Sequence, residues 1–289
     1  MERKPNWAAQ IFLVLHPASV GCLLGALLLD PGGETRAFVI ACVTVALVFA
    51  VAGAGAPVSA IKKPFRSYRF LAGVGHSPLS RQAVLVGLFT LLLLVHWILL
   101  LADMYVQALA IVTVLVGAAA LLVAALVYLL GSQPYWRHWS TLLALIGGLL
   151  ALGITTSLVV ALGWGDALLS DAAGAIAART LVLVGVVLLL AAAWGRATRA
   201  AASVAWTGQE RPSARGGGMR GGLASAMLVI VAGAAAAVSF AWDWAIIICF
   251  VCLLVGLFAH WRLFFVAGAP LDWRAEVNWY VPAPAGGRE

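Results

Sequence analysis

Long apolar runs separated by short polar breaks make up most of this 289-residue chain. A helix needs about 20 apolar residues to cross a hydrocarbon core roughly 30 Å thick. Eight runs meet that length: Trp7 to Leu29, Arg36 to Pro57, Gln82 to Ala102, Ala108 to Gly131, Trp139 to Gly163, Ala175 to Gly195, Gly221 to Ala241 and Trp244 to Phe265. The pattern predicts eight membrane-spanning segments.

The runs have the character of helices rather than of barrel strands. Inside lipid every backbone group must be paired within the protein, which leaves helices or a closed barrel. Continuous Leu, Val and Ala runs lack the alternation of a barrel strand. We therefore expect an all-α polytopic membrane protein: an eight-transmembrane-helix bundle over residues 1–267 and a tail over residues 268–289. The first run is longer than a signal-peptide core, so we expect it to be retained.

The charges indicate how the bundle is oriented. Hydrophobic residues make up 64% of the chain and charged residues 10%, a balance that excludes a water-soluble domain. If both termini and the even-numbered breaks share one side, that side collects all Lys and Arg except Arg36 and Arg179. The positive-inside rule then places both termini in the cytoplasm. The net charge of +7 is explained without a nucleic-acid partner.

The predicted spans contain little that could carry chemistry alone. We expect them to lack the charged relay that ion-coupled transporters usually carry. The four cysteines are expected to pack as small apolar residues, with no iron–sulfur cluster in this chain. They are Cys22, Cys42, Cys249 and Cys252. His16, His96 and His260 fall at unmatched depths, so no haem is expected. No phosphate-binding loop, HExxH motif or nucleophile elbow occurs, which argues against a self-sufficient ATPase or hydrolase.

The break over residues 60–82, AIKKPFRSYRFLAGVGHSPLSRQ, has the most distinctive composition. It mixes five cations, three aromatic residues and a His, and Ser80 has the character of a helix N-cap. Such a segment suits a polar head group or an acidic partner surface. The alternative is a basic loop that orients the chain and rests on lipid phosphates.

A second break, residues 133–139 (QPYWRHW), falls on the same predicted side. It brings together Trp, Tyr, Arg and His residues. Aromatic belts at the membrane surface account for its Trp and Tyr residues. With residues 60–82 it outlines one aromatic face at the membrane edge.

Residues 63–66 (KPFR) followed by 75–82 (GHSPLSRQ) resemble the loop and third-helix entry of the dimethyl sulfoxide reductase anchor subunits, the DmsC-type family. Tyr128 with Pro134, Trp136 and Trp139 is similar to that family's pattern around its fourth and fifth helices. The resemblance implies an anchor for an iron–sulfur electron-transfer subunit and a molybdopterin catalytic subunit. It also implies menaquinol or ubiquinol as the electron donor in anaerobic respiration.

Two positions depart from the family pattern. In an ungapped alignment the family's quinol-site His corresponds to Ala60, and its acidic residue at the third-helix entry corresponds to Gln82. Quinol oxidation needs an acceptor for two protons, and a Gln side chain cannot take one. His76 in the same loop can substitute, and His16 on the first helix is a second candidate. The alternative for His16 is a polar residue bonded across helices or at a turn opened by Pro17.

These observations favour a membrane anchor and quinol-binding subunit of a molybdopterin oxidoreductase complex. The expected quinone-binding residues are Arg66, His76, Gln82, Tyr128, Trp136 and His16. The basic residues expected to face the partner are Lys62, Lys63, Arg69, Arg81 and Arg137. The alternatives are a small-solute membrane transporter and a structural anchor that has lost its quinone site. Neither catalytic residues nor a metal site are expected in this chain.

Overall fold

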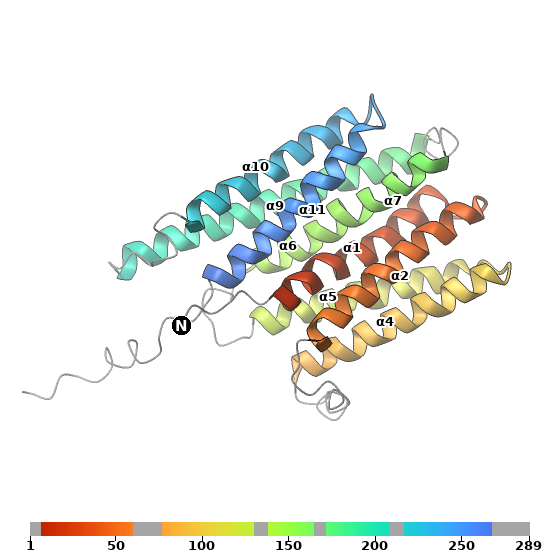
Figure 1. The fold of residues 1–289 in the computed structure, drawn as a ribbon, viewed down its shortest axis with the longest axis horizontal. Coiled ribbons are helices and arrows are strands. Elements are labelled where there is room, and N and C mark those ends of the chain that lie inside the picture. The colour runs from red at the N-terminus through yellow and green to blue at the C-terminus, as the bar shows by residue number, and fades with distance from the viewer. Residues whose placement is uncertain (1–6, 60–76, 130–137, 165–171, 208–216, 268–289) are drawn as a thin grey trace, which may run out of the picture.

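The computed structural model of the chain describes residues 7–59, 77–129, 138–164, 172–207 and 217–267 (Figure 1). Within these ranges the secondary structure is helical and no strand occurs. The elements are α1 (Trp7–Leu29), α2 (Arg36–Ser59), α4 (Pro78–Leu101), α5 (Gln107–Leu129), α6 (Ser140–Gly148), the π-helix η2 (Leu149–Gly153), α7 (Ile154–Ala161), the 3₁₀ turn η3 (Leu162–Trp164), α9 (Ala172–Thr207), α10 (Gly217–Val238) and α11 (Ala245–Ala267).

Seven helical segments in the described ranges are long and apolar enough to cross a membrane. They are Trp7–Leu29, Arg36–Ser59, Pro78–Leu101, Gln107–Leu129, Ser140–Ala161, Ala173–Thr198 and Ala245–Phe265. Part of α10, Leu223–Val238, forms a shorter apolar helix. The helical membrane class is therefore confirmed. The count of eight spans and the side of the termini stay predictions, and the tail over residues 268–289 lies outside the described residues.

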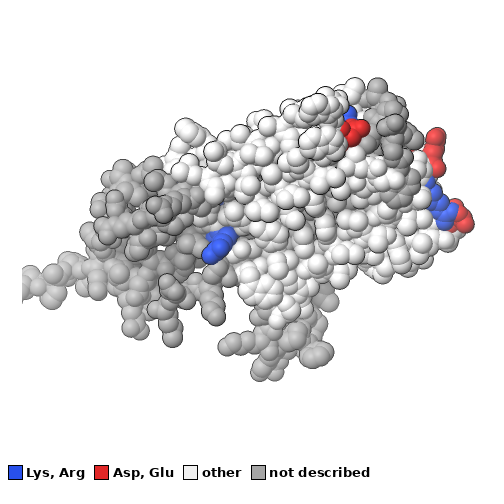
Figure 2. Space-filling view, turned by 45° about the horizontal axis from the view of Figure 1, so that its top comes forward, with Lys and Arg blue, Asp and Glu red and all other residues white. Residues whose placement is uncertain are grey.

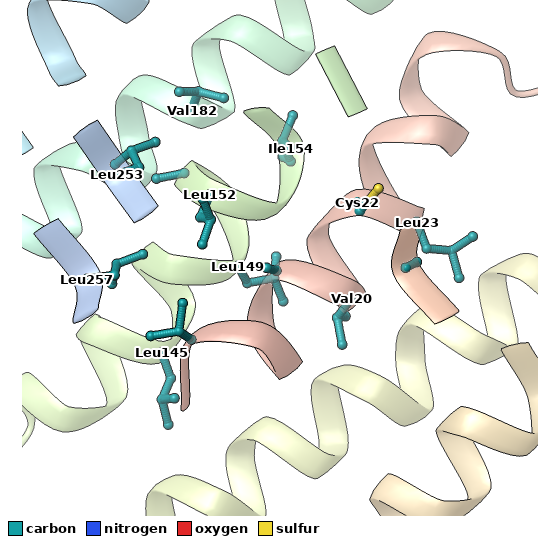
Figure 3. Packing of buried hydrophobic residues seen from close by; sticks show 14 of the residues in the cluster. Val20, Cys22, Leu23, Leu145, Leu149, Leu152, Ile154, Val182, Leu253 and Leu257 are labelled. Atoms are coloured by element: carbon teal, nitrogen blue, oxygen red, sulfur yellow. The ribbon is translucent and has the colours of Figure 1, made fainter. Parts of the chain in front are cut away.

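Helix α1 lies at the centre of the bundle. Its neighbours include α2, α5, α7, η2 and α11. In its most apolar stretch 72% of the residues are buried, the largest share among the seven spans. Figure 1 shows the long helices side by side, with α2, α4 and α5 on one flank of α1 and α9, α10 and α11 on the other. Figure 3 shows where these flanks meet: in this view Leu149 of the fifth span lies between Leu257 of α11 on one side and Val20 of α1 on the other, with Cys22 and Leu23 farther along α1.

The fifth span is one helical segment interrupted by the π-helix Leu149–Gly153. Two side chains after the π-helix donate hydrogen bonds back to its carbonyls, Thr155 to Ala151 at 2.6 Å and Thr156 to Leu152 at 2.7 Å. Single π-turns inside helices widen the backbone locally and occur often near functional sites. This span was expected as one regular helix, and its change of pitch is a finding of the structure.

Charged side chains lie at the two ends of the bundle. We call the end where α1 begins at Trp7 the proximal end, and the end where α1 finishes at Leu29 the distal end. Figure 2 shows red and blue side chains at the distal end and a broad uncharged band beside them. The described acids all lie there: Asp30, Glu34, Asp103 and Asp243. Exposed Trp side chains lie at both ends, which suits aromatic belts at two membrane surfaces. They are Trp7, Trp139, Trp194, Trp242 and Trp244.

Two expectations about charges and loops were wrong. Residues 196–220 were expected as a cytoplasmic loop, but α9 continues to Thr207 and α10 begins at Gly217. The spans were also expected to hold no charge, yet Arg179 lies inside the Ala173–Thr198 span with its side chain 9% exposed. Arg179 pairs with Asp243 in the turn between α10 and α11. This buried charge is tolerated because it has an acidic partner.

The distal turns of α1–α2 and α4–α5 hold each other. The Asp30 carboxylate accepts hydrogen bonds from the backbone N–H groups of Glu34 (2.9 Å) and Thr35 (2.6 Å), which fixes the turn just before α2 begins at Arg36. Tyr105 donates its phenolic hydrogen to the Pro31 carbonyl at 3.1 Å. Its ring lies where a side chain at Gly33 would stand, and Gly33 has φ +68°. Gly33 therefore serves both the left-handed turn and the close approach of Tyr105.

Tyr105 makes the stability of this turn depend on pH in the alkaline range. Burial, and secondarily the Asp30 carboxylate, raise the pKa of Tyr105 above its ordinary value of 10.0. A raised folded-state pKa means that the phenol's contribution is fully present below about pH 10. It is lost as the pH rises through the folded-state pKa, because the phenolate has no hydrogen to donate to Pro31. We expect Tyr105→Phe to be less stable than the wild type by about 1 kcal/mol at neutral pH. Thermal unfolding in detergent across the alkaline range should show this gap closing, and a gap independent of pH would contradict the assignment.

Candidate functional site

Gln82 lies in the first turns of α4 at the proximal end. The helix begins at Pro78, and Ser77 before it has extended backbone angles (φ −119°, ψ 124°), so the N-cap is Ser77 and the expectation of Ser80 as N-cap was wrong. Pro is favoured at this first position because its missing N–H needs no helical partner. Gln82 is buried, whereas Arg81 beside it is exposed. The structure thus directs the amide inward and the guanidinium outward at the end of the loop.

Below Gln82 the buried face of α4 is apolar until it meets His16. The buried residues recur at helical spacing and are Gln82, Val86, Phe89, Leu93, His96 and Leu100. Phe89 contacts the His16 ring edge-on at 5.2 Å between ring centroids. Seven residues separate Gln82 from Phe89, which at 1.5 Å per residue is roughly 10 Å of depth. Gln82 therefore lies on the same buried face of α4 as Phe89, about two turns nearer the helix start, and no contact joins it to His16 among the described residues.

His16 is fully buried within α1. Its ring stacks on Phe12, with centroids 5.1 Å apart and an interplanar angle of 12°. Neither ring nitrogen has a hydrogen-bond partner among the described residues. Pro17 does not open a turn, because α1 continues through it to Leu29, so that alternative for His16 was wrong. A buried imidazole without a hydrogen-bond partner is costly for a purely structural residue.

Tyr128 lies near the proximal end of α5, against α11. Its ring contacts Phe264 at 5.4 Å and Phe265 at 6.1 Å, both edge-on. Neither of these ring contacts involves Gln82 or His16. The structure does not bring together the three expected quinone-site residues that it describes. Gln82 lies near the start of α4, His16 packs against Phe12 and Phe89, and Tyr128 belongs to a separate contact between α5 and α11.

Arg196, which the sequence pattern placed in a loop, lies in α9 at the proximal end. Arg196 extends from α9 over the rings of Trp261 (5.1 Å) and Phe264 (4.7 Å) of α11. Phe264 also contacts Tyr128, so a cation, two aromatic rings and a phenol from three helices form one cluster. Because a guanidinium is attracted to the faces of aromatic rings, these rings stabilise the Arg196 charge near the membrane edge. The signal for it was the Ala-rich stretch after Gly195, which favours a continued helix.

His138 closes the same end of the bundle. Its Nδ1 lies 2.8 Å from the Ser140 hydroxyl and accepts the Ser140 backbone N–H at 3.2 Å, at the start of α6. Its ring is tilted against Trp139 at 4.9 Å. A side chain at Gly195 of α9 would stand 2.9 Å from this imidazole. His138 is therefore a capping residue that packs α6 onto α9.

The remaining expected site residues lie outside the described residues and stay predictions. For the quinone they are Arg66, His76 and Trp136, and the departure at Ala60 belongs with them. For the partner they are Lys62, Lys63, Arg69 and Arg137. Arg81 is described and exposed on the first turn of α4. The described helices that adjoin these breaks, α2, α4, α5 and α6, have their adjoining ends at the proximal side.

The comparisons with known proteins address the whole of this region. A search of curated proteins gives no match. A family model described as DMSO reductase anchor subunit (DmsC) matches residues 1–200, well over half of the chain. The match includes α1, α2, α4, α5 and the fifth span, and with them His16, Gln82 and Tyr128. The resemblance expected from residues 63–82 is thereby confirmed, and the chain belongs to the DMSO reductase anchor subunit family.

Proposed function

We propose that this chain is the membrane anchor and quinol-binding subunit of a molybdopterin oxidoreductase complex in a bacterial inner membrane. The observation that carries the proposal is the family match over residues 1–200. Membership implies association with the catalytic subunits of a DMSO reductase complex at the membrane. In the proposed reaction, quinol is oxidised in this chain and its electrons pass to an iron–sulfur subunit.

The proximal end suits quinol chemistry in three respects. Gln82 offers a buried amide that can hydrogen-bond one quinol oxygen, although it cannot take a proton. His76 in the adjoining break is the expected proton acceptor, and Arg66 addresses the other oxygen. His16, buried in α1 and without a hydrogen-bond partner among the described residues, is a second acceptor. Oxidation of the quinol releases two electrons and two protons, and each of the two imidazoles takes one proton.

Charge at the proximal end supports docking of the soluble subunits there. The described acids all lie at the distal end, whereas the exposed cations Arg81 and Arg262 lie at the proximal end. A basic surface favours a partner with an acidic face and speeds its association. We infer that the iron–sulfur subunit docks over this end, close to the quinol site, so that the electrons travel a short distance.

Replacement of the two expected quinol contacts provides the functional test. In the purified complex, His76→Ala and Arg66→Ala should each lower quinol-driven turnover about a hundredfold, since a positioned acid or base contributes that much or more. Turnover driven by a reduced viologen dye, which feeds the soluble subunits directly, should be unchanged. Arg36→Ala is the matched control, because Arg36 is a partly exposed cation at the distal end, away from both the proposed quinol site and the proposed docking surface. Unchanged quinol turnover in both variants would refute the quinol site.

Purification from the native membrane separates the alternatives. A mild-detergent pull-down of the tagged chain should recover iron and molybdenum together with quinol-linked turnover. Metals without turnover would support a structural anchor that lost its quinone site with Ala60 and Gln82. A metal-free protein recovered alone would instead favour a membrane transporter.

A further inference from the structure

The His16 ring on α1 contacts two phenylalanine rings. Phe12, one turn earlier on the same helix, stacks on it with 5.1 Å between ring centroids and 12° between ring planes. Phe89 of α4 approaches it at 5.2 Å and 86°. The imidazole and the Phe89 ring are both 0% exposed. Because one neighbour lies parallel to the imidazole and the other perpendicular to it, the two rings together define its plane and its position between α1 and α4.

Phe89 is itself seated by a glycine of α5. A Cβ atom at Gly117 would stand 2.8 Å and 2.9 Å from the Cδ2 and Cε2 atoms of Phe89. It would also stand 2.6 Å from Cγ2 of Val20, which lies one turn after His16 on α1. The α5 backbone therefore fills the space beside Phe89, and a residue without a side chain is what fits there. The Phe89 ring is thus confined by α5 as well as by α1.

The backbone that carries His16 is held by two further elements. A Cβ atom at Gly53 of α2 would stand 3.4 Å from the His16 backbone nitrogen. A Cβ atom at Gly148, the last residue of α6, would stand 3.7 Å from Cβ of Pro17. The backbone therefore packs against α2 and α6, whereas the ring packs against Phe12 and α4. His16 cannot shift without a movement of one of these neighbours.

These contacts orient the imidazole without using its nitrogens. A histidine that accepts protons in catalysis is usually oriented by a hydrogen bond from one of its ring nitrogens. Neither nitrogen of His16 has such a partner among the described residues, and its contacts with Phe12 and Phe89 are between rings. Aromatic packing therefore takes the place of the orienting hydrogen bond.

We propose that Phe89, seated by Gly117, is a positioning residue for His16 in quinol oxidation. The inference rests on the proposed function, in which His16 accepts one of the two quinol protons. In that step a quinol O–H bond breaks, an imidazole N–H bond forms, and the electrons leave toward the iron–sulfur subunit. Phe89 acts through the imidazole by holding it in one orientation, and it need not touch the quinol. A reacting group misplaced by roughly 1 Å can cost up to about a hundredfold in rate.

Phe89→Leu in the purified complex tests the proposal, because it keeps an apolar side chain and removes the ring. We expect kcat for quinol-driven turnover to fall about tenfold, with KM for quinol within about twofold of the wild type. Viologen-driven turnover should be unchanged. The matched control is Phe38→Leu, since Phe38 is also 0% exposed but lies at the distal start of α2. It should lose similar thermal stability and keep its quinol turnover, and equal quinol turnover in the two variants would overturn the proposal.

His16→Leu separates this proposal from the function on which it rests. That variant should lower quinol turnover about a hundredfold. Phe89→Leu should add no further loss in that background, since the ring acts only through the imidazole. A further tenfold loss would overturn the positioning role and leave His16 as an acceptor. If His16→Leu alone left turnover unchanged, His16 would not be an acceptor, and this inference would be wrong together with that assignment.

Solid-state NMR of the full chain in lipid bilayers reports the order of the His16 ring without any quinol. The ring C–H signals of His16 are identified by their absence in His16→Leu. Their order parameter should be close to the value of about 0.85 that marks rigid groups, and it should fall in Phe89→Leu. Phe38→Leu should leave it unchanged. An order parameter that is the same in Phe89→Leu and in the wild type would contradict the positioning role.

Discussion

Gly21→Val should be among the most damaging single substitutions in the bundle, lowering the free energy of unfolding by about 3 kcal/mol. A Cβ atom at Gly21 would stand 2.0 Å from the Leu149 carbonyl oxygen and 2.7 Å from the Gly153 Cα. Both contacts are backbone atoms, which cannot rotate away as a side chain can. Because Leu149–Gly153 is the π-helix, α1 crosses the fifth span where its backbone is widened. The substitution therefore weakens the packing of α1 against the fifth span, at the centre of the bundle.

The matched control for this prediction is Gly87→Val in α4. A Cβ atom at Gly87 meets nothing within 4 Å, and the residue is exposed. Thermal unfolding in the same detergent should therefore leave Gly87→Val near the wild type, while Gly21→Ala should already be destabilised. If Gly21→Val and Gly87→Val unfolded alike, the close crossing of α1 and the fifth span would be wrong.

The sequence predicted well those elements whose ends coincide with the ends of apolar runs. The first run was expected at Trp7–Leu29 and forms α1 with those bounds, and the second, expected from Arg36, forms α2 with two residues more. Helix α9 was misjudged because an apolar run ends where the membrane ends, whereas an Ala-rich helix continues beyond it to Thr207. The π-helix in the fifth span was missed, since Leu, Ala and Gly in LLALG favour no particular helical pitch.

The candidate site was only partly predictable, for a different reason. Gln82 and His16 could be named from a family pattern and from the rarity of polar residues in spans, and the structure buries both. Arg196 was overlooked because its partners Trp261 and Phe264 lie far along the chain, and only packing of α9 on α11 brings them together. Arg179 was treated as a charge outside the membrane for the same reason. A lone Arg in an apolar run gives no sign of its partner 64 residues away.

The second large effect on stability is expected for Asp243→Asn, which changes the partner of Arg179. Removing one member of a buried ion pair leaves the other charge uncompensated, which commonly costs 3–5 kcal/mol. Asp243 is 42% exposed, so solvent screens part of that cost. We therefore expect a loss of about 2 kcal/mol in the free energy of unfolding. The double variant Arg179→Met with Asp243→Asn should recover much of the loss, since it removes the uncompensated charge and keeps the apolar volume.

The Arg36–Asp103 pair supplies the matched control at the same end of the bundle. Its side chains are 34% and 82% exposed, so Asp103→Asn should cost less than about 1 kcal/mol. Asn is the suitable replacement because Asp103 has φ 66°, a left-handed conformation that Asn tolerates. Thermal unfolding of the single variants and the double variant completes a thermodynamic cycle for the buried pair. Equal losses for Asp243→Asn and Asp103→Asn, or no recovery in the double variant, would show that Arg179 is not held as a buried charge, because burial is what distinguishes the two pairs.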